Sequence, residues 1–190
     1  MIYFNTQNSG FSLVETLVAV TILLIVIVGP MTLAANATRS TNFSSEQVIA
    51  TFLAQEGAEL AQIARDNILL PRFAGAPGNA WAEFTDTAGA YQDCFAAGCG
   101  LSLNNTTGLV LVEDCGTAGN CILQRDITAG RSLYNHDTGT DTVYTRVVTM
   151  SGTAGDPEVE VVSRVTWRTD NQRQEQSVEV VTYLFNVYGR

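Results

Sequence analysis

The chain has 190 residues and a net charge of -9, which allows a membrane segment and one globular domain with a modest core. It contains no lysine, which excludes Schiff-base chemistry on a lysine and a phosphate-binding loop that ends in Gly-Lys. The single histidine, His136, excludes sites that need two imidazoles from one chain. The excess of 19 acidic over 10 basic residues argues against general nucleic-acid binding, which draws its affinity from neutralised phosphates.

Near its start the chain carries a long apolar segment. Residues 16–38 have no charge and are mostly Leu, Ile, Val, Ala and Met. A helix of that length rises about 34 Å, enough to cross a bilayer core of about 30 Å. We therefore predict a transmembrane helix over 11–38, loosened or kinked at Gly29-Pro30. A cleaved secretory signal is the alternative, because residues 34–37 could serve as its cleavage site.

An amphipathic helix over 39–70 is predicted next. Apolar residues recur at steps of three and four, with one acidic residue among them: Ile49, Phe52, Leu53, Glu56, Leu60, Ile63 and Ala64. The hydroxyl residues at 40–45 could cap a new helix or sit on the polar face of a continuous one. Asn67 and Pro71 are expected to end the helix. A single helix from about Ser12 to Asn67 would have to pack on something along much of its length.

The four cysteines Cys94, Cys99, Cys115 and Cys121 cluster in a polar, glycine-rich region, which suggests disulfides in an oxidising compartment. Of the three possible pairings we favour Cys94–Cys99 and Cys115–Cys121, because these need only short loops. Free thiols or a four-thiolate zinc site are the alternatives. The intervals of four and five residues within the two pairs are wider than usual for zinc.

A globular, strand-rich head is predicted over 71–190. Residues 73–108 should be loop and short irregular structure, whereas 109–115 and 121–126 should form a short strand pair. Three longer strands are predicted at 141–150, 157–169 and 177–189, with a turn at 170–171 before the last. In the middle strand one face carries Val159, Val161, Ser163, Val165 and Trp167. The fold class is therefore α+β, with the long N-terminal helix covering one face of a small antiparallel sheet.

The start of the apolar segment resembles a known processing motif. Gly10-Phe11-Ser12-Leu13-Val14-Glu15, followed by a membrane-length run, is similar to the prepilin cleavage and methylation motif of type IV pilins and pseudopilins. The resemblance covers about residues 10–35. It implies that 1–10 is a leader, that a prepilin peptidase cuts between Gly10 and Phe11, and that the same enzyme methylates the amine of Phe11. Glycine before the cut lets the peptide approach the catalytic carboxylates closely.

The resemblance also implies a role for Glu15, whose ionised side chain would be costly in hydrocarbon. It would pair with the Phe11 amine of a neighbouring subunit as that subunit joins a filament, because a buried charge is much less costly when paired. The alternative is a carboxylate that reaches the lipid headgroups and gains about 0.3–1 kcal/mol from the positive helix start.

The protein is accordingly expected to be a structural subunit, with no catalysis and no cofactor of its own. A minor pilin or minor pseudopilin fits best, because the chain is longer and richer in strands than a minimal major pilin. Its implied partners are other pilin subunits, membrane lipid and the inner-membrane assembly platform of a type IV pilus or type II secretion filament. The chain would cross the cytoplasmic membrane once, with an extracytoplasmic head, before entering a pilus or periplasm-spanning filament.

The leader differs from the usual family pattern because it has no Lys or Arg. The first basic residue, Arg39, lies beyond the apolar segment, which by the positive-inside rule alone would favour the opposite orientation.

Two weaker patterns define the alternative, a membrane-anchored binding domain or enzyme unrelated to filaments. His136, Asp137 and Asp141 could join a serine in a hydrolytic site, although a histidine in this polar turn is expected to be solvated. Asn135, Asp137 and Asp141 are weak calcium candidates. The loop lacks the closing glutamate of an EF-hand, and turn formation explains these residues equally well.

Arg164 and Arg168 share one face of the middle strand and could touch phosphates. Glu160 lies beside them on the same face. We therefore expect these exposed side chains to form ion pairs with residues of the neighbouring strands.

Overall fold

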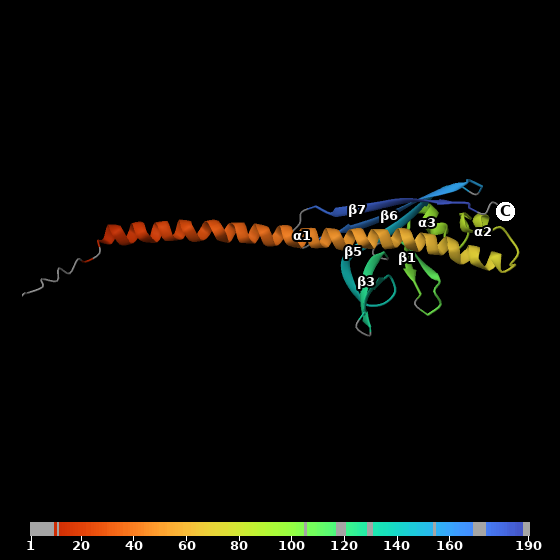
Figure 1. Ribbon diagram of the computed structural model, residues 1–190, viewed down its shortest axis with the longest axis horizontal. Helices are drawn as coiled ribbons and strands as arrows, with labels where there is room; N and C mark the ends of the chain where they lie inside the picture. Colours follow the sequence, from red (N-terminus) through yellow and green to blue (C-terminus); the bar gives the residue numbers. More distant parts are fainter. Residues whose placement is uncertain are drawn as a thin grey trace, which may run out of the picture. The chain divides into compact units, whose positions relative to one another are not determined.

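The computed structural model describes residues 10, 12–104, 106–116, 121–128, 131–153, 155–168 and 174–187. The chain forms two compact units, Met1–Glu46 and Gln47–Arg190 (Figure 1). Helix α1, Leu13–Phe73, begins in the first unit and ends in the second, which also holds a seven-stranded antiparallel sheet. The predicted α+β class is confirmed, although the sheet has more strands than we expected.

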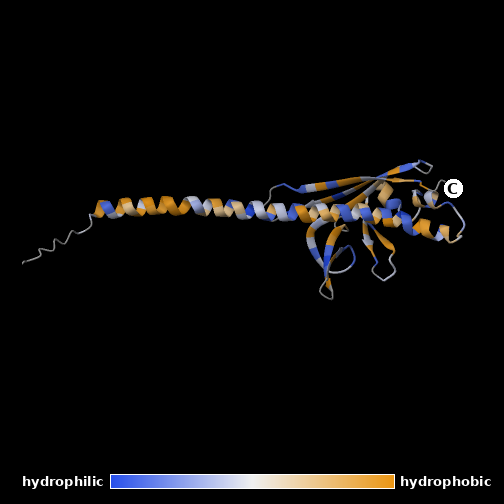
Figure 2. Ribbon diagram, viewed as in Figure 1, coloured by the Kyte–Doolittle hydropathy of each residue, from blue (hydrophilic) through white to orange (hydrophobic). Residues whose placement is uncertain are grey.

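In the first unit, α1 is mostly apolar on all sides from Thr16 to Leu33, and polar residues follow (Figure 2). Among the described residues this is the one helix long and apolar enough, by length and composition, to cross a membrane. The helix does not end at Gly29-Pro30. It also continues through the hydroxyl-rich stretch, where Thr41 and Ser44 donate hydrogen bonds to the carbonyls four residues earlier. The hydroxyl residues therefore lie on a continuous helix and do not cap a new one.

The prediction that Asn67 and Pro71 end this helix was wrong, because α1 continues to Phe73. A proline in the last turn removes one backbone donor, which is a small loss at the end of a helix that packs along its length. The helix stops where Gly75 adopts φ 96°, a left-handed conformation that favours glycine. Its N–H donates to the carbonyl of Arg72, and the next N–H donates to the carbonyl of Pro71.

The sheet is built around its longest strand, β5. The seven strands are β1 (Cys99–Leu103), β2 (Val110–Asp114), β3 (Ile122–Thr128), β4 (Arg131–Asn135), β5 (Thr140–Ser151), β6 (Glu158–Trp167) and β7 (Gln176–Phe185). Strand β5 pairs with β1, β3 and β6, while β2 pairs with β1, β4 with β3, and β7 with β6. All of these pairings are antiparallel.

The three long strands lie where they were predicted, although β7 ends at Phe185 and the prediction ran to 189. The two short segments also form strands, β2 and β3, but their predicted pairing was wrong. The segments 109–115 and 121–126 do not pair with each other, because β2 pairs with β1 and β3 pairs with β4 and β5. Within 73–108, expected to be irregular, the structure forms helices α2 (Ala80–Phe84) and α3 (Gln92–Ala96) as well as β1. Strand β4 was also missed. The predicted turn at 170–171 lies outside the described residues.

The core of the second unit lies between α1 and one face of the sheet. As predicted, the inward row of β6 is buried: Val159, Val161, Ser163, Val165 and Trp167. The facing residues of α1 are mostly small and buried: Ala50, Ala54, Gly57, Ala58, Ala61 and Ala64. Small side chains let the helix backbone approach the sheet closely, and Gly57 lies at the tightest point. A Cβ atom there would be 2.2 Å from the Ser163 Oγ.

We therefore expect Gly57→Ala to destabilise the second unit. In an ordinary helix interior the change from glycine to alanine is favourable by about 1 kcal/mol. Here the added methyl meets Ser163 and, at 3.0 Å, the Cδ of Arg146, so overpacking should cost about 1–3 kcal/mol. Unfolding of the full chain in detergent can be followed by the fluorescence of Trp81 and Trp167, which are both buried in this unit.

Gly29→Ala is the matched control, because a Cβ atom at Gly29 has no neighbour within 4 Å. Adding Ser163→Gly to Gly57→Ala should recover part of the lost stability. Equal stability of Gly57→Ala and the parent chain would show that the close approach is not a constraint.

Candidate functional site

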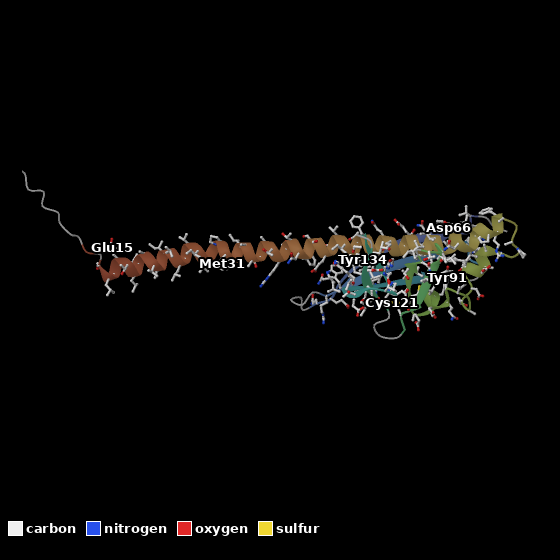
Figure 3. All side chains as sticks on the ribbon, turned by 90° about the horizontal axis from the view of Figure 1, so that it is seen from below. Glu15, Met31, Asp66, Tyr91, Cys121 and Tyr134 are labelled. Atoms are coloured by element: carbon white, nitrogen blue, oxygen red, sulfur yellow. A yellow bond between two sulfur atoms is a disulfide. The ribbon has the colours of Figure 1, made fainter. Side chains whose placement is uncertain are left out.

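The first turn of α1 positions Glu15. The Ser12 carbonyl accepts hydrogen bonds from the N–H groups of Glu15 and Thr16, at 3.0 and 3.1 Å. The Glu15 carboxylate therefore lies at the positive end of the helix, which stabilises it by about 0.3–1 kcal/mol. Its side chain is exposed at the start of the helix (Figure 3). Within the described part of the chain it has no ion-pair partner.

The predicted processing site lies just before this turn. Gly10 is exposed, and a Cβ atom at Gly10 would meet nothing within 4 Å. Phe11, the residue expected to be methylated, lies outside the described residues.

Comparison with known families identifies this segment. A model of the prokaryotic N-terminal methylation motif matches residues 5–29. The chain carries the type IV pilin and pseudopilin signature. Neither the curated proteins nor the solved structures contain a match to the chain. The signature does not distinguish a minor from a major pilin, and it covers the start of α1 but no part of the sheet.

In the second unit, a buried arginine joins the helix to the sheet. Arg146 on β5 is fully buried. Its Nη1 donates to the Leu53 carbonyl at 3.2 Å and to the Glu56 carboxylate at 3.0 Å, and its Nη2 donates to the Leu101 carbonyl at 2.7 Å. Burial lowers the pKa of Arg146, and the charge and hydrogen bond of Glu56 oppose that shift. One guanidinium thus holds together α1, β1 and β5.

We missed this ion pair in the sequence. Glu56 was treated as an interruption of the apolar helical row, and Arg146 was not singled out. Both residues carried a usable signal. An acidic residue on the buried row of the helix and a basic residue on the inward row of β5, between Tyr144 and Val148, are expected to be partners, since buried charges need pairing.

Both disulfides are local. Cys94 of α3 pairs with Cys99 of β1, and Cys115 pairs with Cys121 between β2 and β3. This is the pairing favoured from loop length. It leaves none of the four cysteines as a free thiol or as a zinc ligand. Cys94 and Cys99 belong to the hydrophobic core, so their disulfide ties the segment that follows α2 to the sheet.

The weak calcium candidates do not form one site. Asn135 Oδ1 accepts hydrogen bonds from the N–H groups of Asp137 and Thr138, at 2.8 and 2.7 Å, and so closes a turn. Asp141 Oδ1 accepts from Gln124 Nε2 at 2.9 Å. Asn135 and Asp137 line one cleft, and Asp141 lines another. Within the described ranges no cluster of three or more His, Cys, Asp or Glu is arranged to hold a metal.

The expectation that His136 is a solvated loop residue was wrong, because only 7% of it is exposed. Its ring packs on β1, where a Cβ atom added to Gly100 would lie 3.0 Å from the ring. Burial and the charge of Arg146 lower the pKa of His136 to about 4, while a backbone contact with Ile122 acts in the opposite direction. Neither ring nitrogen has a hydrogen bond of good geometry within the described part of the chain. This buried, neutral imidazole does not support the hydrolytic alternative.

On the outer face of the sheet, Arg164 forms the expected cross-strand ion pair, whereas Arg168 forms none with another described residue. Arg164 and Glu179 are register partners and form an ion pair at 2.6 Å. Beside them, the Tyr183 hydroxyl donates to the Glu160 carboxylate at 2.8 Å. Because Arg164 already pairs with a carboxylate of the protein, it is a poor candidate for the phosphate contact considered from the sequence.

Replacing the buried arginine should destabilise the head strongly. We expect Arg146→Ala to lower the free energy of unfolding by about 3–5 kcal/mol, because it leaves a cavity and removes the donors that satisfy buried carbonyls. Tryptophan fluorescence during urea unfolding measures the change. Arg164→Ala, which breaks an exposed pair, is the control and should cost about 1 kcal/mol or less. Similar losses in the two variants would contradict the role of Arg146.

The buried histidine should make stability depend on pH. Its pKa is about 4 in the folded chain and 6.5 as the ordinary value, so between these values the unfolded chain binds the proton more tightly. Stability is therefore expected to fall as the pH drops from about 6.5 to 4, by up to roughly 3 kcal/mol.

The measurement is urea unfolding at several pH values, for the parent chain and for His136→Gln. The variant removes the imidazole but keeps every carboxylate, so its stability should change less within this window. Parallel pH profiles for the two chains would exclude the histidine as the cause.

Proposed function

We propose that this protein is a structural subunit, a minor pilin or pseudopilin, of a type IV pilus or type II secretion filament. In this proposal it enters the cytoplasmic membrane as a single-pass precursor with its head outside. The observation that carries the proposal is the methylation motif at residues 5–29, continued by a helix without charge from Thr16 to Thr38. Both disulfides suit an oxidising extracytoplasmic compartment.

Processing supplies the group that assembly needs. A prepilin peptidase would cut after Gly10 and methylate the new amine of Phe11. The Glu15 carboxylate, one turn into the helix, would then accept the amine of an incoming subunit. Because a carboxylate in hydrocarbon is costly when alone and less costly when paired, the pairing favours the filament over subunits dispersed in lipid.

Mass spectrometry of the mature N-terminus from cells tests the class. We expect a chain that begins at Phe11 and carries one methyl group. An intact Met1 would contradict the proposal and favour a membrane-anchored head of another kind. Copurified assembly components would then separate a pilus from a secretion filament.

Glu15→Gln tests the assembly step. The variant should be cut and methylated normally but enter filaments at least tenfold less, because the amide cannot neutralise the incoming amine. The amount of the chain in sheared filament fractions, relative to the membrane fraction, measures this.

Glu59→Gln is the matched control, since it removes an exposed carboxylate from the same helix outside the apolar segment. Normal incorporation of Glu15→Gln would refute the pairing. Failure of both variants would point to a general defect of the helix.

A further inference from the structure

An apolar cleft with an exposed arginine lies near the start of the part of α1 that belongs to the second unit. Its volume is about 440 Å³. Ile49 of α1, Ile127 of β3, Tyr134 of β4 and Tyr144 of β5 form its apolar walls. The two tyrosine rings meet edge to face, with centroids 6.5 Å apart. Figure 3 shows Tyr134 beside α1 at this end of the unit.

Arg125 supplies the charge of this cleft. In the second unit Arg65, Arg72, Arg146 and Arg164 each form an ion pair with a carboxylate. Arg125 is exposed at the cleft and forms no ion pair with another described residue. This cleft therefore suits a ligand that brings a carboxylate beside an apolar group.

Asp141 also lines the cleft, but its carboxylate accepts a hydrogen bond from Gln124. This carboxylate would repel an incoming acid. Its removal should therefore leave binding intact or strengthen it.

A second exposed surface has the complementary chemistry. On the outer face of β6 and β7, Glu158 and Phe185 are register partners, and both are exposed. Phe185 has 52% of its surface accessible, and Val187, two residues further, has 65%. An acidic side chain thus lies directly beside an uncovered aromatic ring.

The two surfaces lie at different ends of the second unit. Ile49 lines the cleft, whereas Arg65 and Leu69 of the same helix line a small cavity together with Phe185. The intervening 16 to 20 residues of helix correspond to about 24–30 Å. Figure 1 shows the same separation, with β3 near one end of the unit and the end of β7 near α2 at the other.

We propose that Glu158 and Phe185 of one copy of this chain dock into the Arg125 cleft of the next copy. The carboxylate pairs with the guanidinium, and the ring packs on the isoleucine and tyrosine side chains. The contact joins unlike surfaces, so each added copy presents a new open cleft and the contact can repeat. It rests on the proposed filament function, and it requires that copies of this chain be neighbours in the filament.

The small size of the contact explains why it needs that arrangement. A few side chains on each copy bury on the order of 400 Å², against about 800 Å² per partner in a standard stable interface. Free heads should therefore not dimerise by this contact alone. Copies held side by side through their helices meet at a high effective concentration, at which a weak contact forms.

Photo-crosslinking of the full chain in cells tests the contact. Benzoylphenylalanine at position 185 should give a covalent dimer of this chain. The cross-linked residue should lie in β3 or β4, near Ile127 or Tyr134. Arg125→Glu and Glu158→Arg should each lower the dimer yield at least tenfold. Combining the two swaps the charges and should restore the yield to within about twofold of the parent, which a folding defect would not allow.

Asp141→Asn and Glu113→Arg are the controls and should not lower the yield. The first removes the other charge of the cleft, and the second reverses an exposed charge on β2. A cross-link to another protein or to lipid, or a charge swap without rescue, overturns the proposed contact.

The methylation state of Phe11 is measured in the same cells. Filaments that contain methylated chain but no cross-link at position 185 overturn the contact and leave the proposed function standing. An unprocessed chain overturns the proposed function, and without the cross-link it overturns the contact as well.

Discussion

The head depends on one buried cation, Arg146, and on the close approach of α1 that surrounds it. A guanidinium without exposed surface must have acceptors in fixed places, and here they come from α1 and β1. Sliding the helix by one residue would move the Leu53 carbonyl and the Glu56 carboxylate away together. The small residues around Gly57 let the helix lie close enough for these bonds. Register and packing are therefore set by the same contact.

The long elements could be predicted because their patterns are local and repeated. The alternation along β6 places five side chains on one face, as predicted. The predicted row along α1 marks the buried side only in part, because Leu53, Leu60 and Ala64 are buried whereas Phe52 and Ile63 are exposed. The short strands carry no such pattern. The segment Cys99–Leu103 has a glycine and a serine among five residues, and Arg131–Asn135 is largely polar. They form strands because they pair with distant partners, which periodicity does not reveal.

The predicted pairing of 109–115 with 121–126 was wrong for the same reason. Their proximity in sequence favoured a hairpin, but each segment pairs with other strands of the sheet.

The candidate site could be predicted from the sequence, whereas the polar contacts inside the second unit could not. The processing motif could be found from sequence because it is a contiguous segment whose meaning does not depend on the fold. His136 could not be placed, because its neighbours in the chain are those of a solvated turn. Its ring packs on Gly100, far away in sequence, where a Cβ atom would lie 3.0 Å from the imidazole. Glu56 and Arg146 are 90 residues apart, and their pairing follows from the position of β5 beneath the helix.

The N-terminal segment and the second unit differ in where their charged groups find partners. In the proposed function, the motif segment carries a carboxylate whose charge is costly in lipid until another chain supplies an amine, so its contribution would favour association. The second unit pairs part of its charge internally, in the core and on the outer face of the sheet. In the proposed function, a weak contact between exposed surfaces suits a subunit that would move singly in the membrane before it assembles. Strong self-association of heads would trap subunits early, whereas weak contacts act only after the helices have brought the copies together.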